Sequence, residues 1–566
     1  MNWRKKNVYK VIRSIIEAVV LIILLMIIIR ALFSFNTYEP YREEEAVSNS
    51  GFIALSYFGV DRTGNSTLTS TKRLDEHLKA LYKQGYVTIT GQDIKDYFET
   101  GKALPEKALF LIFEDGRNET AIFAQNIMEK YNYKGTIMTY AQKLEENSSK
   151  FLKGEDLKKL LDSTFWELGT NGYRLSYINV FDGNHNYFGE MSEEEYAALH
   201  DDLGKEYNHY LMDYIRDKDG IPKESYKEMY KRISDDYEKM ERMYEDEVGE
   251  VPQLYMLMHA NTGKFGTNNR VSEVNEEWIK RMFQMNFNRE GNSWNTHTDK
   301  LQKADSALYN LTRMQIQPDW YSNHLLMRIK YDTKQDLEFM NGIQKQYDKW
   351  TILEGALECK PEKAVLTSIP KGAAKILLKG DRKWKNFRVQ VTLTGNTSGS
   401  QSIYLRADNE LTTYVSVSFD NHTLYIKETS PAGEKELFKV KLMDADESKL
   451  ISKSEISKAK IDIEMSEDNI SVWVDDILTA DKVRLSEIKE GTIGLGCEWV
   501  KEDQGQKYTT DDVYDGVFEK LSVTTLPHEK NKTETLYDNH LHGLDKVNDV
   551  IKGVLDSVIN WFIKYL

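Results

Sequence analysis

Two adjacent carboxylates, Glu114 and Asp115, directly follow the apolar run 108–113 and precede Gly116. A continuous apolar run of this length is typical of a strand that is buried on both faces, as in parallel sheets and barrels. In parallel barrels, residues at the carboxyl ends of the strands line the active site. The sequence therefore predicts that Glu114 and Asp115 lie at a candidate active site.

The elements around this pair alternate between strands and helices. The run 52–57 is apolar, leucines at positions 74, 78 and 81 have helical spacing, and residues 86–89 favour a strand. Further on, apolar residues at three- and four-residue spacing predict a helix over 226–247 that packs on the sheet. We expect a distorted (β/α) barrel over residues 50–350, with a helical insertion at about 178–222.

The pattern changes after residue 360. Residues 387–393, 413–419, 461–465 and 470–474 alternate between apolar and polar positions, with turns between the runs. Short alternating strands without a helical pattern indicate an antiparallel β-sandwich, expected here over residues 360–526. Asp475 and Asp476 belong to a turn in this pattern, so we do not interpret them as an acid and base pair.

The order of motifs in the first region resembles that of the NodB-type polysaccharide deacetylases. The matching pieces are Leu55-Ser-Tyr-Phe-Gly-Val60, Gly85-Tyr-Val-Thr-Ile-Thr90, Leu104-Pro-Glu-Lys-Ala108, Ile112-Phe-Glu-Asp-Gly116, Phe165-Trp-Glu-Leu-Gly169 and Leu254-Tyr-Met-Leu-Met-His-Ala260. In the second region, Gly491-Thr-Ile-Gly-Leu-Gly496 resembles a late strand of concanavalin-like jelly rolls, which include laminin-G-type modules. These resemblances imply a deacetylase-like barrel followed by a jelly-roll sandwich.

The first resemblance also implies a chemistry. In that family a divalent metal such as zinc polarises the acetyl carbonyl and lowers the pKa of its bound water. By position, Glu114 stands for the general base and Asp115 for a metal ligand. The two histidine ligands of the family are replaced by Asn171 and Leu175, and its early Tyr-His pair by Tyr57 and Phe58.

One carboxylate and one neutral amide are too few ligands for a stable zinc site. We therefore expect metal-dependent deacetylation to be impaired and no cofactor to be needed, with a divalent metal required only if the site is active. His185 or His259, together with Asp182, could rebuild a ligand set. The alternative is that His185 is a solvated loop residue and His259 a strand-end histidine with a structural partner.

Several side chains are candidates for binding a sugar substrate. In the barrel they are Asn171, Tyr173 and His259, which lie near the damaged motifs. In the sandwich they are the aromatic residues Trp384, Tyr404, Tyr414 and Trp499. Packing in the core of the sandwich is the alternative for these four, because aromatic residues dominate such cores.

The two ends of the chain differ from both domains. Basic residues precede the apolar run 18–29, which predicts a transmembrane anchor within residues 1–36 with a cytoplasmic N-terminus; a cleaved signal peptide is the alternative. Residues 37–49 are acidic and predict a solvated spacer. Residues 534–566 carry an apolar stripe at helical spacing, which indicates an amphipathic helix that docks on its own domain, on a partner or on a membrane.

The overall composition restricts the function. The net charge of -15 argues against nucleic acid as a partner. The two cysteines, Cys359 and Cys497, allow one disulfide at most, and two buried free thiols are the favoured interpretation.

We expect a single-pass protein of the cell membrane whose extracellular part binds or processes a cell-surface or exported polysaccharide, with metal-dependent removal of acetyl groups impaired. An active, divergent deacetylase is the first alternative. The second is a scaffold that holds a glycan synthase or export protein through the terminal helix.

Overall fold

A computed structural model describes residues 36–543 apart from gaps at 147, 200–202, 204–207, 258–267, 298–306, 381, 396–398, 421–422, 443–456, 487, 501–510 and 527–532. Toward the ends it describes residues 10–11, 13–15, 17–19, 21–22, 546–547, 550–551, 553–555 and 557. The chain forms two units: Met1–Leu78, Tyr86–Gln315 and Val550–Leu566 make up unit 1, and Lys79–Gly85 and Ile316–Asp549 make up unit 2. Each unit is described by itself below.

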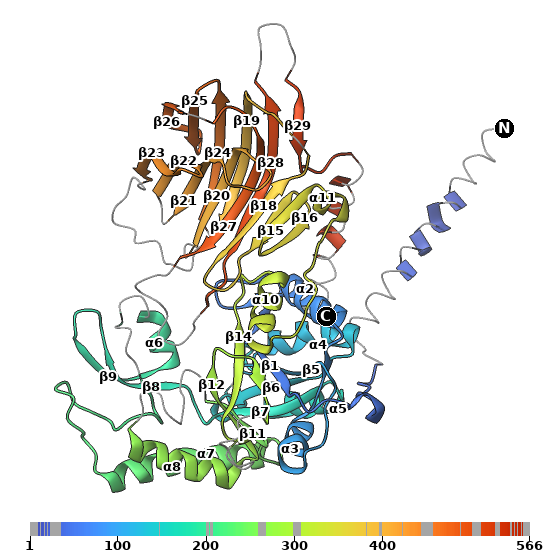
Figure 1. The fold of residues 1–566 in the computed structure, drawn as a ribbon. Helices are drawn as coiled ribbons and strands as arrows, with labels where there is room; N and C mark the ends of the chain where they lie inside the picture. The colour runs from blue at the N-terminus through green and yellow to red at the C-terminus, as the bar shows by residue number, and fades with distance from the viewer. Residues whose placement is uncertain are drawn as a thin grey trace. The chain divides into compact units, whose positions relative to one another are not determined.

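Unit 1 contains a closed parallel barrel, which confirms the predicted barrel fold (Figure 1). Its strands follow one another in the order β1-β14-β12-β11-β7-β6-β5, and β5 pairs with β1 to close the ring. The strands are β1 (Phe52–Tyr57), β5 (Ala108–Phe113), β6 (Gly135–Tyr140), β7 (Trp166–Gly172), β11 (Leu254–Tyr255), β12 (Met285–Glu290) and β14 (Leu311–Ile316). Two short strands, β4 (Val87–Thr88) and β13 (Trp294–Asn295), extend the sheet beside β5 and β1.

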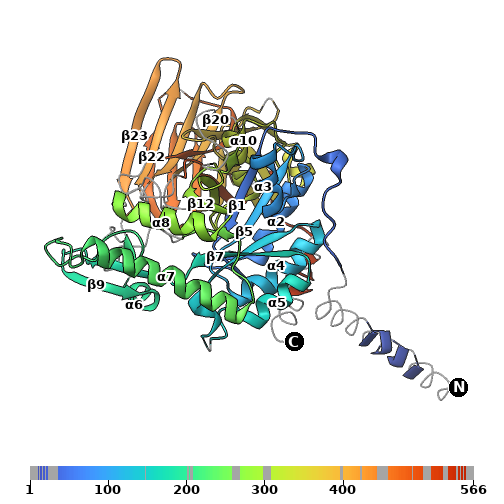
Figure 2. The ribbon, with the colours of Figure 1, turned by 90° about the horizontal axis from the view of Figure 1, so that it is seen from below.

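Helices cover the outside of the barrel, and α7 and α8 lie side by side (Figures 1 and 2). They are α2 (Thr71–Lys83), α3 (Gly91–Thr100), α4 (Asn118–Tyr131), α5 (Gly154–Asp162), α7 (Tyr226–Glu247) and α8 (Asn269–Met282). The short elements between them are β2 (Val60–Asp61), β3 (Thr69–Ser70) and the 3-10 helix η2 (Ala141–Leu144). Helix α7 has the bounds expected from the sequence, and Met229, Ile233 and Tyr237 are among its buried residues.

The lumen of the barrel is apolar along most of its length. Side chains that alternate along the strands meet there, as interior positions of a barrel must. The buried lumen cluster includes Phe52, Ala54, Phe110, Ile112, Met138, Leu254, Met256, Met285, Phe287 and Leu311. Because side chains alternate between the two faces of a strand, the residue two positions after each floor residue also faces the lumen, nearer the carboxyl end of the strand.

Most residues of the segment 37–49 are exposed, as expected for a solvated spacer, but the segment also contacts the barrel. The Tyr38 hydroxyl donates to the Thr88 carbonyl at 2.9 Å, and the Tyr41 hydroxyl donates to Asp93 at 2.8 Å. The segment includes the 3-10 helix η1 (Glu43–Glu45) and ends with a β-bridge between Ser48 and Leu104. Its two tyrosines fix this segment to the barrel wall, which the count of glutamates did not reveal.

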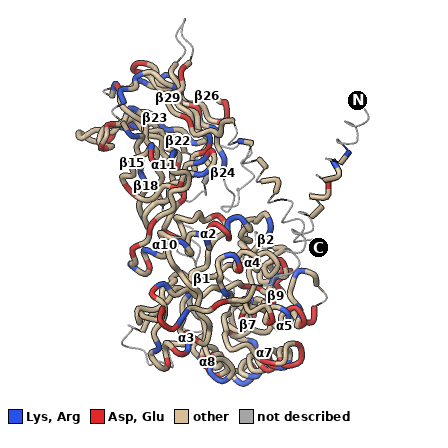
Figure 3. The backbone as a smooth tube through the Cα atoms, turned by 90° about the vertical axis from the view of Figure 1, so that its right-hand side faces the viewer, with Lys and Arg blue, Asp and Glu red and all other residues tan. Residues whose placement is uncertain are grey.

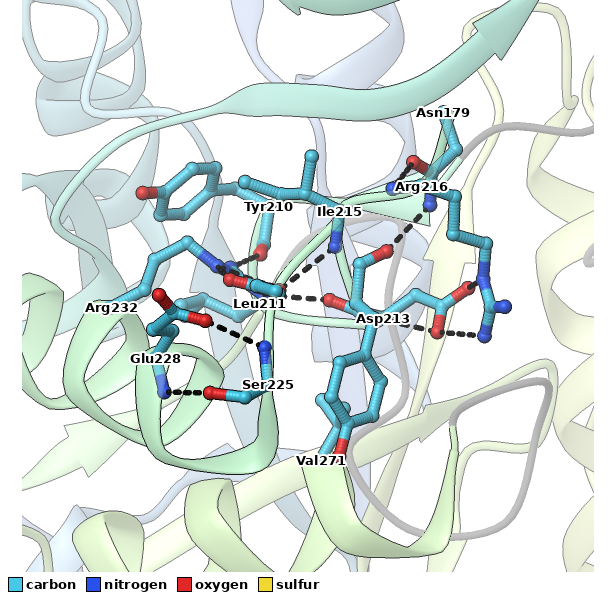
Figure 4. A network of polar contacts seen from close by, with 12 residues as sticks. Asn179, Tyr210, Leu211, Asp213, Ile215, Arg216, Ser225, Glu228, Arg232 and Val271 are labelled. Atoms are coloured by element: carbon cyan, nitrogen blue, oxygen red, sulfur yellow. Dashed lines mark hydrogen bonds and ion pairs between the residues drawn. The ribbon is translucent and has the colours of Figure 1, made fainter. Parts of the chain in front are cut away.

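The predicted insertion forms a small sheet in the order β10-β8-β9. Its elements are β8 (Ser176–Phe181), β9 (Tyr187–Ser192), α6 (Glu193–Leu199) and β10 (Asn208–His209). The loop that follows is held by Arg232 of α7, whose guanidinium donates to the carbonyls of Tyr210 and Asp213 and to the Glu224 carboxylate (Figure 4). The insertion is therefore attached firmly to the barrel helices.

Unit 2 contains two packed antiparallel sheets, as predicted. The first sheet, in the order β15-β18-β27-β20-β21-β22-β23, comprises β15 (Trp350–Glu354), β18 (Ala373–Leu378), β20 (Gly399–Ala407), β21 (Tyr414–Asp420), β22 (Thr423–Ser430), β23 (Gly433–Lys441) and β27 (Thr492–Trp499). The second, in the order β16-β17-β28-β19-β24-β25-β26, comprises β16 (Ala356–Lys360), β17 (Lys363–Thr367), β19 (Phe387–Gly395), β24 (Ser457–Ser466), β25 (Asn469–Val474), β26 (Ile477–Arg484) and β28 (Asp515–Thr525), with β29 (Thr535–Asp538) paired to β28.

A single large apolar cluster fills the sandwich and includes both cysteines. Cys359 and Cys497 are buried free thiols, as favoured from the sequence. Two further helices, α10 (Ser322–Thr333) and α11 (Gln344–Tyr347), also belong to unit 2. The barrel was expected to extend to residue 350, whereas unit 2 already begins its second segment at Ile316.

The ends of the chain are described only in part. No helix among the described residues has the length and apolar character needed to cross a membrane. Most of the predicted anchor lies outside the described residues, and the described positions from 10 to 22 are helical and exposed. Residues 535–538 form β29, so this part of the segment 534–566 is a strand rather than a helix. The described residues from 546 to 557 are helical.

Acidic and basic residues are interspersed along the described chain in both units (Figure 3). The net charge of -15 is thus distributed over the molecule rather than concentrated in one stretch. Such a surface favours solubility and does not provide the basic face that nucleic acid requires.

Candidate functional site

A layer of polar side chains lies at the carboxyl end of the barrel strands. Each member stands two positions after a residue of the lumen floor, so it lies on the same inner face. Four members are Ser56 after Ala54, Glu114 after Ile112, Tyr140 after Met138 and Arg313 after Leu311. The fifth is Asn171 after Gly169, where an added Cβ would meet Met138 and Leu254 of the floor. All five are buried, with at most 3% of their surface exposed. In a parallel barrel this end is where ligands bind and reactions occur.

Glu114 forms a buried ion pair across the barrel. Its Oε1 accepts a hydrogen bond from Arg313 Nε at 2.9 Å, and the two residues are 199 positions apart in the chain. The second oxygen, Oε2, has no hydrogen-bond partner among the described residues. Glu114 therefore keeps one acceptor for a group that enters the barrel.

Asp115 lies next to Glu114 in a strained turn. Its φ of 71° is in the left-handed region, which side chains other than glycine rarely adopt. Its Oδ2 lies 2.8 Å from Arg117 Nη2, an ion pair whose angles do not make a hydrogen bond. Burial raises the pKa of Asp115 from 3.8 to about 7, although Arg117 acts in the opposite direction. Burial thus makes the charged form of Asp115 costly, and the Arg117 guanidinium partly offsets that cost.

Tyr140 completes the acidic side of the layer. Burial raises the pKa of its phenol well above 10, and the nearby charges of Asp115 and Glu114 contribute to the shift. Its hydroxyl has no partner among the described residues, and the same is true of Ser56 Oγ and Asn171 Oδ1. A buried polar atom without a partner lowers stability by about 1–3 kcal/mol, so the presence of several such atoms in one layer requires an explanation.

The donor set does not fit the divalent ion that the family resemblance implies. Asp115 is occupied by Arg117, and Asn171 uses its amide nitrogen to donate to the Met256 carbonyl at 2.8 Å. Leu175 packs against the small cluster of the insertion sheet and offers no ligand atom. Among the residues that the structure describes, no group of three histidines, cysteines or acidic residues is arranged to hold a metal ion.

The other predicted barrel residues lie in different places. His185 is exposed in the turn between β8 and β9, where its amide donates to the Asp182 carbonyl at 3.1 Å. No described contact brings His185 or Asp182 to Asp115. Tyr173 is half-buried, and its carbonyl accepts a hydrogen bond from the Gln142 amide at 2.8 Å. His259 lies outside the described residues.

The predicted aromatic residues of the sandwich do not form one row. Tyr404 is buried, and its ring contacts Tyr414 edge-on with centroids 4.9 Å apart. Trp499 donates its indole N–H to the Asp511 carbonyl at 3.0 Å, and Trp384 packs beside Phe387 with ring centroids 6.1 Å apart. These contacts favour the packing interpretation for Trp384 and Trp499.

Sequence reasoning missed Ser56, Arg117, Tyr140 and Arg313. The alternation within strands would have pointed to three of them, since each stands two positions after a lumen residue. Arg313 is the clearest case, because an arginine on the largely buried strand Leu311–Ile316 needs an acidic partner. Its partner could not be read from spacing alone.

Comparison with known proteins gives matches that each cover part of the chain. No protein-family model matches the chain. Over 83 residues the chain is 30% identical to a Bacillus subtilis (strain 168) protein named "Putative polysaccharide deacetylase YxkH"; this is 15% of the present chain, and it spans only 29% of the relative.

Two solved structures are also similar. A de-N-acetylase from Aggregatibacter actinomycetemcomitans has 15% sequence identity and a TM-score of 0.36, and the match covers 48% of this chain and 96% of the other. The carbohydrate binding module CBM66 from Bacillus subtilis has 18% identity and a TM-score of 0.24, and it covers 31% of this chain and 94% of the other. The comparisons confirm the resemblance of this chain to polysaccharide deacetylases.

Proposed function

We propose that the barrel binds a cell-surface or exported polysaccharide, and that it does so without metal-dependent removal of acetyl groups. The observation that carries this proposal is the buried polar layer, in which Ser56 Oγ, Glu114 Oε2, Tyr140 Oη and Asn171 Oδ1 have no partner among the described residues. Sugars carry many hydroxyl groups, and each hydroxyl both donates and accepts hydrogen bonds. A sugar ring at this end of the barrel would supply the partners that these atoms lack.

The layer has the composition of a ligand site rather than of a packing defect. A few convergent polar groups lie above an apolar floor, the usual arrangement where a small polar ligand binds. Glu114 and Asn171 offer acceptors, whereas the Tyr140 and Ser56 hydroxyls can also donate. This mixture suits a neutral sugar or an acetamide group better than a bare ion.

A membrane location is part of the proposal. Basic residues precede the apolar run 18–29, and the described helical positions Val11, Ile15, Val19, Leu21 and Ile22 expose their apolar side chains. A single anchor with a cytoplasmic N-terminus would place both units outside the cytoplasm. Resistance of the protein to carbonate extraction, with digestion of both units by protease added to intact cells, is the expected result.

The C-terminal helix is proposed to contact a glycan synthase or export protein. Its described apolar residues Val547, Val550, Ile551, Val554 and Leu555 are each more than half exposed. Acidic residues on its polar face disfavour a lipid surface and favour a protein partner. The double substitution Val550→Asp and Leu555→Asp should abolish co-purification of a membrane partner and leave sugar binding by the barrel unchanged.

The main experiment measures binding and chemistry in the same preparation. The full chain in detergent is titrated calorimetrically with oligosaccharides of N-acetylated amino sugars and with their deacetylated forms, while acetate release is measured by an enzymatic assay. We expect saturable binding, weakened by Tyr140→Phe, and no acetate release with or without added zinc.

Two outcomes would contradict this proposal. Acetate release with stoichiometric metal, abolished by Asp115→Asn, would show an active divergent deacetylase. Binding of no oligosaccharide, together with stable co-purification of a membrane protein, would show a scaffold instead.

A further inference from the structure

The turn that carries Asp115 is fixed on both sides. Asp115 has a positive φ, and the next residue, Gly116, also has a positive φ of 57°. A Cβ atom on Gly116 would lie 2.6 Å from Thr139 Cγ2 and 3.1 Å from the Met138 carbonyl oxygen, so the turn is pressed against the end of β6. The Asp115 carboxylate is therefore held at a defined place at the mouth of the barrel.

The group that faces this carboxylate is the guanidinium of Arg117. Besides its ion pair with Asp115 at 2.8 Å, the guanidinium carbon lies 5.3 Å from the ring centroid of Phe58 and 5.9 Å from that of Phe151. Only 15% of the Arg117 side chain is exposed. Contacts with a carboxylate and with two aromatic faces are those that a guanidinium favours, so Arg117 is a built part of the site.

Further positive charge surrounds the same place. The Lys143 and Lys150 ammonium groups lie 4.9 and 4.6 Å from the ring centroid of Phe151, the ring that Arg117 also contacts. Lys143 pairs with Glu193 at 3.5 Å, and Lys150 lies 4.0 Å from the same carboxylate. The acidic groups near Asp115 are thus already matched by cations that belong to the protein.

We infer that the Arg117 guanidinium occupies the place of a divalent ion at Asp115, so that the barrel contains a permanent internal cation and excludes metal ions. The inference rests on the deacetylase-like site of the proposed function. One departure from the family pattern supports this: Phe58, at the position of a histidine, provides a ring on which Arg117 packs, while Arg117 occupies the carboxylate that a metal would need.

The chemical reason is that guanidinium and metal compete for one carboxylate. A structural or catalytic zinc ion needs at least three protein ligands, of which Asp115 is the one that the chain retains. An arginine remains protonated at every physiological pH, so Asp115 is not released by deprotonation of its partner. A divalent ion that approached would also meet the repulsion of Arg117, Lys143 and Lys150.

The test uses cobalt(II), whose visible absorption reports its coordination, and three variants of the full chain. The reference variant, Phe58→His with Asn171→His, adds two imidazoles beside Asp115 and keeps the guanidinium. Adding Arg117→Ala to it removes the guanidinium, and adding Arg117→Lys keeps a cation at that place. Circular dichroism of each variant establishes that it is folded. We expect no stoichiometric cobalt in the wild type, in the reference variant or in the variant with lysine.

The variant with alanine should bind cobalt at least about tenfold more tightly than the reference variant, a difference well within calorimetric resolution. The inference is overturned if the wild type binds cobalt stoichiometrically and loses it in Asp115→Asn. It is also overturned if removal of the guanidinium leaves cobalt affinity unchanged. No sugar is present in this titration, so a failure of the proposed polysaccharide binding would not affect its outcome.

Discussion

Each unit contains a buried group of charged residues, and the two groups differ in how completely they are paired. In unit 2, His324 lies between Asp511 and Asp515, at 3.1 Å from each. In unit 1, Glu114 and Asp115 lie at the mouth of the barrel, and three of their four oxygens have no hydrogen-bond partner among the described residues. His324, Glu114 and Asp115 are buried, and the Asp511 side chain is 28% exposed. The two groups differ most in the partners that the protein supplies.

The group in unit 2 satisfies both carboxylates. Asp511 Oδ2 accepts from the Trp320 indole at 2.8 Å, and Asp515 accepts from Thr367 Oγ1 at 2.6 Å and from the Tyr321 amide at 3.0 Å. Such a network stabilises helix α10 against the sandwich. In the barrel layer, several buried polar atoms have no hydrogen-bond partner among the described residues. This is expected where a ligand, rather than the protein, supplies the partners.

The largest expected effect comes from breaking the paired group. His324→Ala should lower the free energy of unfolding by about 3–5 kcal/mol, because two buried carboxylates lose their shared cation. Urea unfolding monitored by tryptophan fluorescence measures this, since Trp320 stacks on His324. His185→Ala, in the exposed turn, is the matched control and should change stability by no more than about 0.5 kcal/mol. A loss below about 1 kcal/mol for His324→Ala would contradict the comparison.

The second prediction concerns pH. Burial alone would lower the pKa of His324, but the carboxylates of Asp511 and Asp515 outweigh it and raise the pKa from 6.5 to about 10. The folded state therefore retains a proton that the unfolded state loses above pH 6.5. The stabilisation is complete below that pH and is lost as the pH rises toward 10, by up to about 1.4 kcal/mol per pH unit.

This slope should be absent in His324→Ala. Urea unfolding at several values between pH 7 and 10 compares the two proteins directly. Equal slopes for both would show that His324 does not carry the charge assigned to it.

The sequence predicted the parts of the fold that depend on local pattern. The apolar runs 52–57 and 108–113 correspond to β1 and β5. The alternating runs of the second region lie within β19, β24 and β25, and the run 413–419 begins one residue before β21. Asp475 and Asp476 form a turn, and both have a positive φ. Strand periodicity is set by neighbouring residues, so it can be recognised without knowledge of the tertiary fold.

The candidate site was less accessible to this reasoning. Glu114 and Asp115 were identified because they end an apolar strand, but Arg313 lies 199 positions from Glu114 and pairs with it only through closure of the barrel. Tyr140 and Ser56 have residue types that occur throughout strands. What distinguishes them is the absence of a partner among the described residues, and this property depends on long-range packing.

The third prediction sharpens the comparison within unit 1 by the removal of one hydroxyl group. Tyr140→Phe should raise the free energy of unfolding by about 1 kcal/mol, because a buried hydroxyl without a partner is removed. Sugar binding should weaken by about tenfold, because the sugar loses one hydrogen-bond partner. Groups at a binding site often lower stability in this way.

Tyr244→Phe is the matched control for this change. Its hydroxyl is also buried, but it donates to the Thr139 carbonyl and lies 2.9 Å from Thr170 Oγ1. Its removal should therefore lower stability by about 1 kcal/mol and leave sugar binding unchanged. If both substitutions destabilise the protein equally, Tyr140 has a structural partner, and the polar layer is no longer evidence for a ligand site.

The smallest expected effect compares two fully buried serines, one in each unit. Ser56 has no partner for its hydroxyl among the described residues, whereas Ser368 Oγ accepts from the Tyr514 amide at 2.9 Å. Ser56→Ala should raise the free energy of unfolding by about 0.5 kcal/mol, and Ser368→Ala should lower it by about 1–2 kcal/mol because an amide N–H is left buried. Urea titrations of both variants measure the difference in sign. The same sign in both units would mean that partner satisfaction does not distinguish the barrel mouth from the sandwich, and the case for a ligand in the barrel would fail with it.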